Sequence, residues 1–234
     1  MDKAGVNSAS GKRIVIAIDG PAGSGKSTLA SLLARKYNYT NIETGAMYRA
    51  LALKAMQTGV PLDDAAALGA LASQSGIELQ PKPEGNRVFL DGADVTERIR
   101  LKDITEAASR VSVHPAVREW MVDRQREIGA GGGIVMEGRD IGTKVFPNAE
   151  VKLFLDAAPE VRGTRRFLQS PTTATPEASV LAELHQRDQR DRTRANSPLV
   201  PAPDAILIDS TNLSLEQVVT RATEIIDERL KSFS

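Results

Sequence analysis

The stretch Gly20-Pro21-Ala22-Gly23-Ser24-Gly25-Lys26-Ser27-Thr28 decides how this chain folds, because it matches the pattern G-x-x-x-x-G-K-[ST]. An apolar run over 14–18 precedes it, so a strand, a glycine loop and a helix beginning near Ser27 are predicted. Glycines let backbone N–H groups point inward, and the helix N-terminus adds positive potential, which together form a cup for phosphate oxygens. A glycine-rich turn without a ligand is the alternative, but the Lys-Ser pair stands where a phosphate site needs it.

Each of the nine residues of this loop is therefore a candidate for binding a nucleoside triphosphate. Lys26 would supply a charge for the β- and γ-phosphates, and Ser27 would offer its hydroxyl to Mg²⁺. The loop thus predicts a nucleoside triphosphate and Mg²⁺ as cofactors.

The composition limits the class of protein. The chain has 234 residues, is 41% apolar and carries 30 basic and 30 acidic side chains. This length suits one domain with an insertion or two small domains, and the balanced charge does not attract nucleic acid or anionic membranes. The absence of cysteine excludes disulfides and cysteine nucleophiles and fits a reducing compartment. No apolar run approaches the roughly 20 residues of a membrane span, and residues 1–11 are predicted to be a flexible tail.

Further apolar runs alternate with helical patterns, which predicts an α/β fold with a five-stranded parallel sheet and helices on both faces. The expected strands cover 14–18, 39–43, 134–136, 151–156 and 205–209. Between the second and third of them, strand-like runs and the turn Asp91-Gly92 predict a small inserted antiparallel β subdomain over 61–100. The pattern leaves open whether this insertion closes over a substrate or is purely structural.

Several helix positions are also predicted. Thr44 is expected to cap the second helix, and Arg118 is expected to lie off the apolar stripe of its helix. Ser214 and Gln217 form a capping box for the last helix, whose Leu215 is expected to face the core.

The placement of arginines narrows the function, since a phosphate loop alone does not separate kinases, GTPases, motors and transporters. The chain is too short for most motor assemblies, and the Asn-Lys-x-Asp guanine reader is absent. Two phosphate-bearing reactants repel each other, so an enzyme that joins them needs several fixed cations. Candidate cations near the carboxyl edge of the sheet are Arg49, Arg118, Arg139, Arg165, Arg187, Arg190 and Arg194. For Arg49 alone, an exposed helical position fits equally well.

The helix end from 187 to 194 allows two interpretations. Arg187, Asp191 and Arg194 share one face, while Asp188 and Arg192 are expected to pair at i,i+4. Such runs usually mark a solvated, salt-bridged helix. The surplus of arginine over aspartate also suits a phosphate clamp.

Six segments together resemble the bacterial cytidylate kinase family, in the same order and spacing, over nearly the whole chain. These segments are 20–28, 43–49, 137–143, 145–147, 187–194 and 209–211. The resemblance implies a P-loop nucleoside monophosphate kinase that uses Mg-ATP to convert CMP and dCMP to CDP and dCDP by direct in-line phosphoryl transfer. It also implies a cytoplasmic location and small nucleotides as partners, without nucleic acid or membrane, and we expect a monomer.

The resemblance also implies a domain plan. A P-loop core would comprise 12–60 and 101–234, with a short arginine-rich lid near 165–197. The inserted subdomain over 61–100 would belong to the monophosphate side.

The same resemblance implies roles for individual residues. The CMP phosphate would be held by Arg49, Arg139, Arg194 and Thr44. Cytosine would be read by Ser109, Arg118 and Asp140, and the sugar hydroxyls would meet Arg187 and Asp191. The catalytic group, which neutralises charge on the transferring phosphoryl, would be Lys26, Arg139, Arg165 and Arg190.

The chemistry of the base supports this reading. Cytosine offers an amino donor at N4, which suits the carboxylate of Asp140, and acceptors at N3 and O2, which suit the guanidinium of Arg118. Uracil would place a carbonyl against Asp140. Glu137 stands where the family more usually has Asp and could hold Mg²⁺ through water. His114 and His185 are interpreted as structural.

Three alternatives stay open: a kinase acting on UMP or AMP, a kinase acting on a phosphate-free metabolite, and a regulatory module that binds ATP without transferring phosphate.

Overall fold

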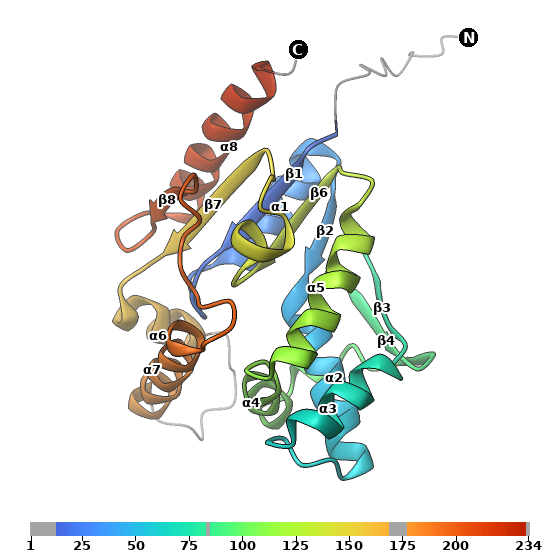
Figure 1. Ribbon diagram of the computed structural model, residues 1–234. Helices are drawn as coiled ribbons and strands as arrows, with labels where there is room; N and C mark the ends of the chain where they lie inside the picture. The colour runs from blue at the N-terminus through green and yellow to red at the C-terminus, as the bar shows by residue number, and fades with distance from the viewer. Residues whose placement is uncertain (1–12, 83–84, 169–176, 233–234) are drawn as a thin grey trace, which may run out of the picture.

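A five-stranded parallel sheet forms the centre of the computed structural model, which describes residues 13–82, 85–168 and 177–232 (Figure 1). Its strand order is β2-β6-β1-β7-β8. The strands are β1 (Val15–Asp19), β2 (Thr40–Glu43), β6 (Ile134–Gly138), β7 (Val151–Asp156) and β8 (Ile206–Asp209). Each neighbouring pair runs parallel, which confirms the predicted fold class. β6 runs two residues further than expected, because it stays paired with β1 as far as Gly138.

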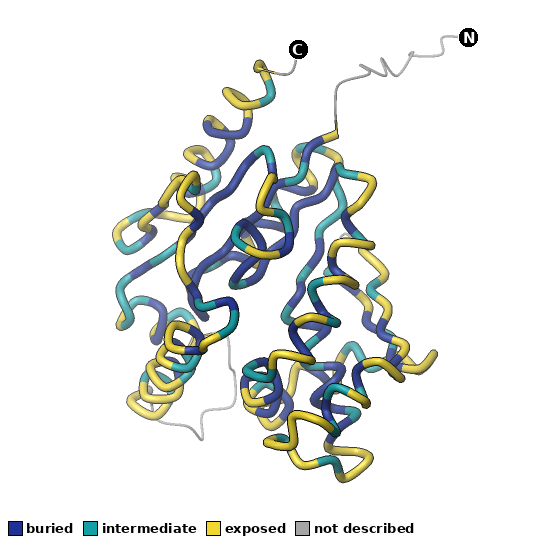
Figure 2. The backbone as a smooth tube through the Cα atoms, viewed as in Figure 1, coloured by how far each residue is buried: buried dark blue, intermediate teal, exposed yellow. Residues whose placement is uncertain are grey.

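Helices cover both faces of this sheet. α1 (Lys26–Tyr37) and α8 (Leu215–Lys231) pack on one face, and α5 (Pro115–Gly129) with the π-helical turn η2 (Ile141–Val145) packs on the other. Successive residues of β1 alternate between the two cores, as the pleat requires. The tube drawing accordingly shows the inner strands β1, β6 and β7 buried and the helices exposed along their outer sides (Figure 2).

Two groups of elements extend beyond the carboxyl ends of the strands, at the lower left and lower right of Figure 1. One group is α6 (Pro159–Leu168) and α7 (Glu177–Thr193). The other is α2 (Thr44–Thr58), α3 (Ala65–Ser73), η1 (Arg98–Arg100), α4 (Lys102–Val111) and the antiparallel strands β3 (Ile77–Gln80), β4 (Arg87–Leu90) and β5 (Ala93–Asp94). The second group has its own apolar core, which includes Leu51, Leu68 and Ile104.

Two local expectations were wrong. Glu43 is the N-cap of α2, while Thr44 is already helical and its Oγ1 donates to the Glu137 carbonyl oxygen at 2.8 Å. Leu215 is 52% exposed, although the capping box formed by Ser214 and Gln217 is present as predicted. Arg118 is buried, with 2% of its surface exposed, and its guanidinium pairs with Asp140.

The expected pair between Asp188 and Arg192 is also absent. Asp188 instead accepts from Nη1 of Arg162 on α6 at 2.5 Å, and Arg192 lies 3.6 Å from a carboxylate oxygen of Asp156. Because α6 and α7 pack side by side, a buried partner on the neighbouring helix replaces the partner one turn away.

The predicted tail over 1–11 falls outside the described residues, as does the part of the predicted lid over 169–176. Among the helices that the structure describes, none is both long and apolar enough to cross a membrane.

Candidate active site

The glycine loop between β1 and α1 folds back on the sheet, and two of its glycines are required by close approach. Gly20 has φ +150°, and a Cβ there would lie 2.0 Å from the Leu155 carbonyl oxygen. Gly23 has φ +77°, and a Cβ there would lie 2.9 Å from the Arg162 carbonyl oxygen. Side chains at either position would push the loop off β7 or α6.

Lys26 lies inside this loop. Its Nζ donates to the Pro21 carbonyl oxygen at 2.6 Å and lies 3.4 Å from Ser24 Oγ. Burial, together with the charge of the nearby Arg139, lowers the pKa of Lys26 to about 7, and Glu137 opposes the change. Phosphate oxygens beside the amine would favour its charged form, so an anion in the loop would raise this pKa again.

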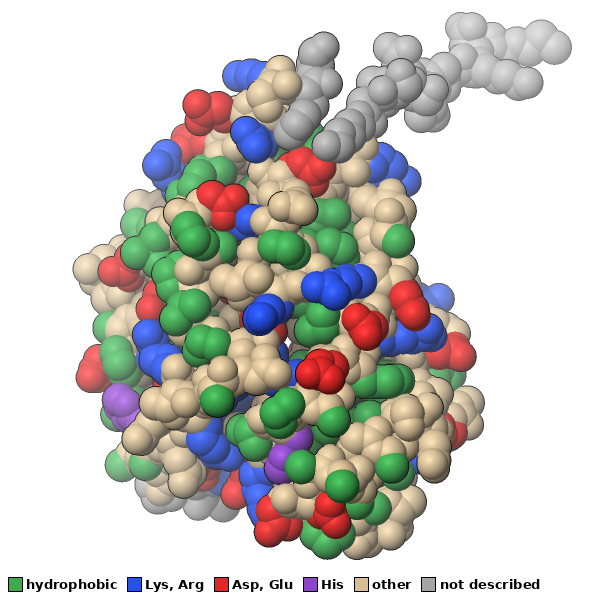
Figure 3. Space-filling model, viewed as in Figure 1, with side chains coloured by type: hydrophobic (Ala, Val, Ile, Leu, Met, Phe, Trp, Pro, Cys, Tyr) green, Lys and Arg blue, Asp and Glu red, His purple; other side chains and the backbone are tan. Residues whose placement is uncertain are grey.

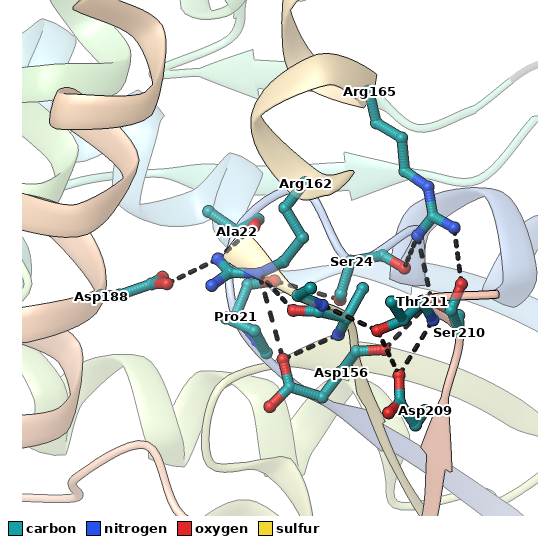
Figure 4. A network of polar contacts seen from close by, with 12 residues as sticks. Pro21, Ala22, Ser24, Asp156, Arg162, Arg165, Asp188, Asp209, Ser210 and Thr211 are labelled. Carbon is teal, nitrogen blue, oxygen red and sulfur yellow. Dashed lines mark hydrogen bonds and ion pairs between the residues drawn. The ribbon is translucent and has the colours of Figure 1, made fainter. Parts of the chain in front are cut away.

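Two arginines of α6, Arg162 and Arg165, contact backbone carbonyl oxygens of the glycine loop (Figure 4). Arg162 donates to the Ala22 carbonyl oxygen at 3.1 Å and to Asp188 of α7, so it joins the loop to both helices. Arg165 points to the end of β8, where it donates to Oγ and to the carbonyl oxygen of Ser210 at 2.9 and 2.8 Å. The loop and the α6–α7 pair therefore form one connected unit.

A cavity of about 200 Å³ opens between the glycine loop, α2, α4, α5 and α7. Its lining is strongly basic: seven cationic side chains face four carboxylates. The cations are Lys26, Arg49, Arg118, Arg139, Arg166, Arg187 and Arg194, and the carboxylates are Glu43, Glu137, Asp140 and Asp191. In the space-filling view, basic side chains gather at the lower centre of the molecule (Figure 3).

Four of these arginines keep a buried nitrogen without a hydrogen-bond partner among the described residues. The atoms are Nε of Arg49, Arg118 and Arg187, and Nη2 of Arg194. Burial lowers the pKa of Arg187 to about 10, and repulsion from Arg139 adds to the effect. Because buried donors are normally satisfied, these atoms point to an anionic ligand that would accept from them.

Asp191 organises the arginines from α7. Its carboxylate accepts from Nε of Arg139 at 3.0 Å and lies 3.6 Å from Nη1 of Arg194. Burial raises the pKa of Asp191, but Arg139, Arg187 and Arg194 together hold it below its ordinary value. Asp191 is thus ionised and fixes the two arginines at the cavity wall.

A buried ion pair forms the far end of the cavity. Arg118 Nη2 lies 2.5 Å from Asp140 Oδ2, and Arg118 Nη1 donates to the Ser112 carbonyl oxygen at 3.1 Å. The guanidinium also lies over the ring of Tyr48, 5.6 Å from its centroid. Burial raises the pKa of Tyr48 to about 12, so its hydroxyl is protonated. A carboxylate, a guanidinium and a hydroxyl together offer both acceptors and donors to a polar ring.

Ser27 and Glu137 form an oxygen-rich corner beside the loop. Ser27 Oγ donates to Glu137 Oε1 at 2.7 Å, and burial raises the pKa of Glu137, although Lys26 opposes this. A hydroxyl and a carboxylate next to a phosphate site fit Mg²⁺, which prefers oxygen ligands and keeps several waters. Within the described residues, no group of three or more His, Cys, Asp or Glu side chains could hold a metal by itself.

Most of the residues singled out from the sequence line the cavity. They are Ala22, Gly23, Lys26, Ser27, Thr44, Arg49, Arg118, Arg139, Asp140, Arg187, Asp191 and Arg194. Outside the glycine loop, three predicted residues do not line the cavity: Arg165 binds Ser210, Arg190 contacts Gln186, and the buried Ser109 accepts from Ser112 Oγ through its carbonyl oxygen. The remaining loop residues, Gly20, Pro21, Ser24, Gly25 and Thr28, shape the loop without lining the cavity.

Sequence reasoning gave no role to several lining residues, among them Tyr48, Ser112 and Arg166. Tyr48 precedes Arg49 on α2, Ser112 follows α4, and Arg166 is the neighbour of Arg165 on α6. The side of α6 that faces the cavity is set by its packing on α7, so spacing alone gave no signal for choosing Arg166.

The chain is similar to known proteins over most of its length. The family model described as "Cytidylate kinase" matches residues 16–228. A cytidylate kinase of Geobacillus thermodenitrificans is 50% identical, over 94% of this chain and 99% of that protein. One of Pelotomaculum thermopropionicum is 51% identical, over 87% and 92%. One of Pasteurella multocida is 45% identical, over 93% and 97%.

Proposed function

The chain belongs to the cytidylate kinase family, and from that premise we propose that it transfers the γ-phosphoryl group of ATP to CMP and dCMP, giving ADP with CDP or dCDP. The observation that carries the proposal is the basic cavity, in which four arginines present a buried nitrogen that has no partner among the described residues. The glycine loop and these arginines line the same cavity. Two phosphate-bearing reactants that must meet end to end could therefore bind there together.

The ATP phosphates belong in the glycine loop. Its inward N–H groups and the N-terminus of α1 would cradle them, and Lys26 would move from the Pro21 carbonyl to the β- and γ-phosphates. Ser27, with Glu137 behind it, would hold Mg²⁺, which supplies charge neutralisation on the phosphate oxygens.

The monophosphate belongs on the opposite wall. Arg49, Arg139 and Arg194 would bind the CMP phosphate, with Thr44 nearby, while Arg187 and Asp191 would meet the sugar. The pair of Arg118 and Asp140 would read cytosine. The buried Ser109, whose hydroxyl has no partner among the described residues, would assist this pair from outside the cavity wall. The phosphoryl group then passes in line, with Lys26 and Arg139 stabilising its charge and no covalent intermediate.

Two arginines assigned to catalysis lie outside the cavity wall. For Arg165 and Arg190 to neutralise the transferring group, the α6–α7 unit would have to close further over the loop. We therefore propose the region 165–197 as a lid and the inserted region 61–100 as the part that closes from the monophosphate side. A cytoplasmic monomer acting on small nucleotides is proposed on the family alone.

We expect CMP and dCMP to give the highest turnover when a panel of monophosphates is incubated with Mg-ATP and ADP release is measured. UMP should be poorer by about tenfold to a hundredfold in kcat/KM, since one mismatched contact to a base costs about 1–3 kcal/mol. Uracil would place a carbonyl against Asp140 and an N–H against Arg118.

The same ADP-release assay, run with the monophosphates and also with phosphate-free acceptors, separates the rival functions. Dominant turnover with AMP or UMP, or with a phosphate-free acceptor, would replace CMP as the substrate. ADP release that neither class of acceptor stimulates would support a nucleotide-binding regulatory module.

A further inference from the structure

Asp19 is a buried carboxylate that the proposed chemistry does not use. It is the last residue of β1, directly before Gly20 of the glycine loop, and 4% of its surface is exposed. It does not line the cavity. Its side chain instead turns to the segment after β6, where Oδ1 accepts from the Ile141 N–H at 2.8 Å and Oδ2 accepts from the Gly142 N–H at 2.7 Å.

These two bonds fix the backbone next to Asp140. The N–H groups of Ile141 and Gly142 open the π-helical turn η2, so they have no partner within it, and one carboxylate satisfies both. Asp140 itself has φ −149° and ψ 26°, outside the regular helical and strand regions. Its carbonyl oxygen is held from the other side by the Lys144 N–H at 2.8 Å. The direction of the Asp140 side chain therefore depends on this anchoring.

The packing leaves little space for the turn to move. A Cβ built on Gly142 would lie 3.2 Å from Lys152 Cδ and 3.3 Å from Asp19 Oδ2. The Lys152 ammonium does not neutralise Asp19, because its Nζ binds both carboxylate oxygens of Asp204 at 2.8 Å. Asp19 thus receives its hydrogen bonds from the turn.

We propose that Asp19 is a positioning residue, which sets Asp140 at a fixed place relative to the phosphate loop and thereby controls the choice of CMP over UMP. The proposal rests on the proposed function. The backbone of Asp19 leads into the glycine loop, where ATP would bind, and its carboxylate holds the turn next to Asp140, which would read the base. A small rotation at residue 140 would weaken the contact to cytosine N4 and reduce the penalty against uracil.

The charges around Asp19 make its ionisation sensitive to pH. Burial, with a smaller contribution from Asp140, raises the pKa of Asp19 to about 6, although the N–H groups of Gly142 and Ile141 and the charge of Lys26 oppose the rise. Below this pH, the carboxyl group carries a proton and can no longer accept equally from two N–H groups.

The test is the ratio of kcat/KM for CMP to that for UMP in Asp19→Asn. The amide places an NH₂ group against one backbone N–H, so one bond is replaced by a donor–donor contact. We expect the ratio to fall at least tenfold, while the Kd of ATP changes less than threefold. Asp227→Asn is the matched control, because Asp227 is an exposed carboxylate of α8 that accepts one bond from the Tyr37 hydroxyl at 2.7 Å and does not line the cavity. It should change neither the CMP to UMP ratio nor the Kd of ATP.

A second measurement uses the wild-type protein and needs no folded variant. Between pH 7.5 and 5.5 the CMP to UMP ratio should decline as Asp19 gains its proton, and titration of the substrate phosphate cancels in the ratio. A ratio that stays within twofold in Asp19→Asn and across this pH range would overturn the positioning role, even if the melting temperature drops. A wild-type protein without preference for CMP at pH 7.5 would instead refute the proposed function, and the inference with it.

Discussion

Lys26→Met is expected to lower kcat at least about 100-fold, the loss typical of removing one donor that stabilises charge in a transition state. Lys26 is 5% exposed, and its ammonium is the cation that sits inside the glycine loop. Methionine fills a similar volume without a charge. Because burial lowers the pKa of Lys26 to about 7, its charged form costs folding stability below its unfolded pKa. The melting temperature at neutral pH should therefore stay equal or rise.

The matched control is Lys36→Met, since Lys36 is exposed in the last turn of the same helix. It should keep wild-type kcat in the ADP-release assay. A kcat of Lys26→Met within threefold of wild type would remove Lys26 from the transfer step.

Arg118→Ala is expected to destabilise the fold by about 3–5 kcal/mol, because it leaves Asp140 buried without a counterion. The side chains of this pair are only 3% and 7% exposed. In the variant that remains folded at low temperature, KM for CMP should rise at least tenfold, while KM for ATP should change less than threefold. Chemical denaturation measures the loss of unfolding free energy, and steady-state kinetics measures the KM values for CMP and ATP.

Arg124→Ala on the same helix is the control. Arg124 is 44% exposed and pairs with Glu127 at 2.7 Å, so its loss should cost less than about 1 kcal/mol. If Arg118→Ala raised both KM values equally, the pair would be structural and would not read the base. Arg118→Lys, which keeps the charge but not the planar fork, offers the same comparison with less risk of unfolding.

The fold was predictable from sequence because its main signals are local. Apolar runs separated by helical patterns gave the five parallel strands, and the glycine loop identified β1 and α1. The π-helical turn over 141–145 was not predictable, since its first N–H groups are held by Asp19, more than a hundred residues earlier. The signal in the sequence that could have indicated this contact is Asp19 itself, a charged residue at the end of the apolar strand β1.

The residues of the site were largely predictable, but the contacts among them were not. Arg187, Asp191 and Arg194 share a face, as their spacing indicates, and that face lines the cavity. Which neighbour each side chain meets depends on tertiary packing, so Asp188 binds Arg162 rather than Arg192. The same reason separates Arg166, at the cavity, from Arg165, at Ser210.

We propose that a backbone amide cup and a set of arginines hold two anions end to end in one cavity. Binding of adenosine and cytidine joined through a polyphosphate bridge tests it most directly. We predict that this compound binds at least about 100-fold more tightly than ATP or CMP alone, because the second contact becomes intramolecular, and that ATP and CMP each displace it. A compound that binds no more tightly than ATP and is not displaced by CMP would contradict the claim.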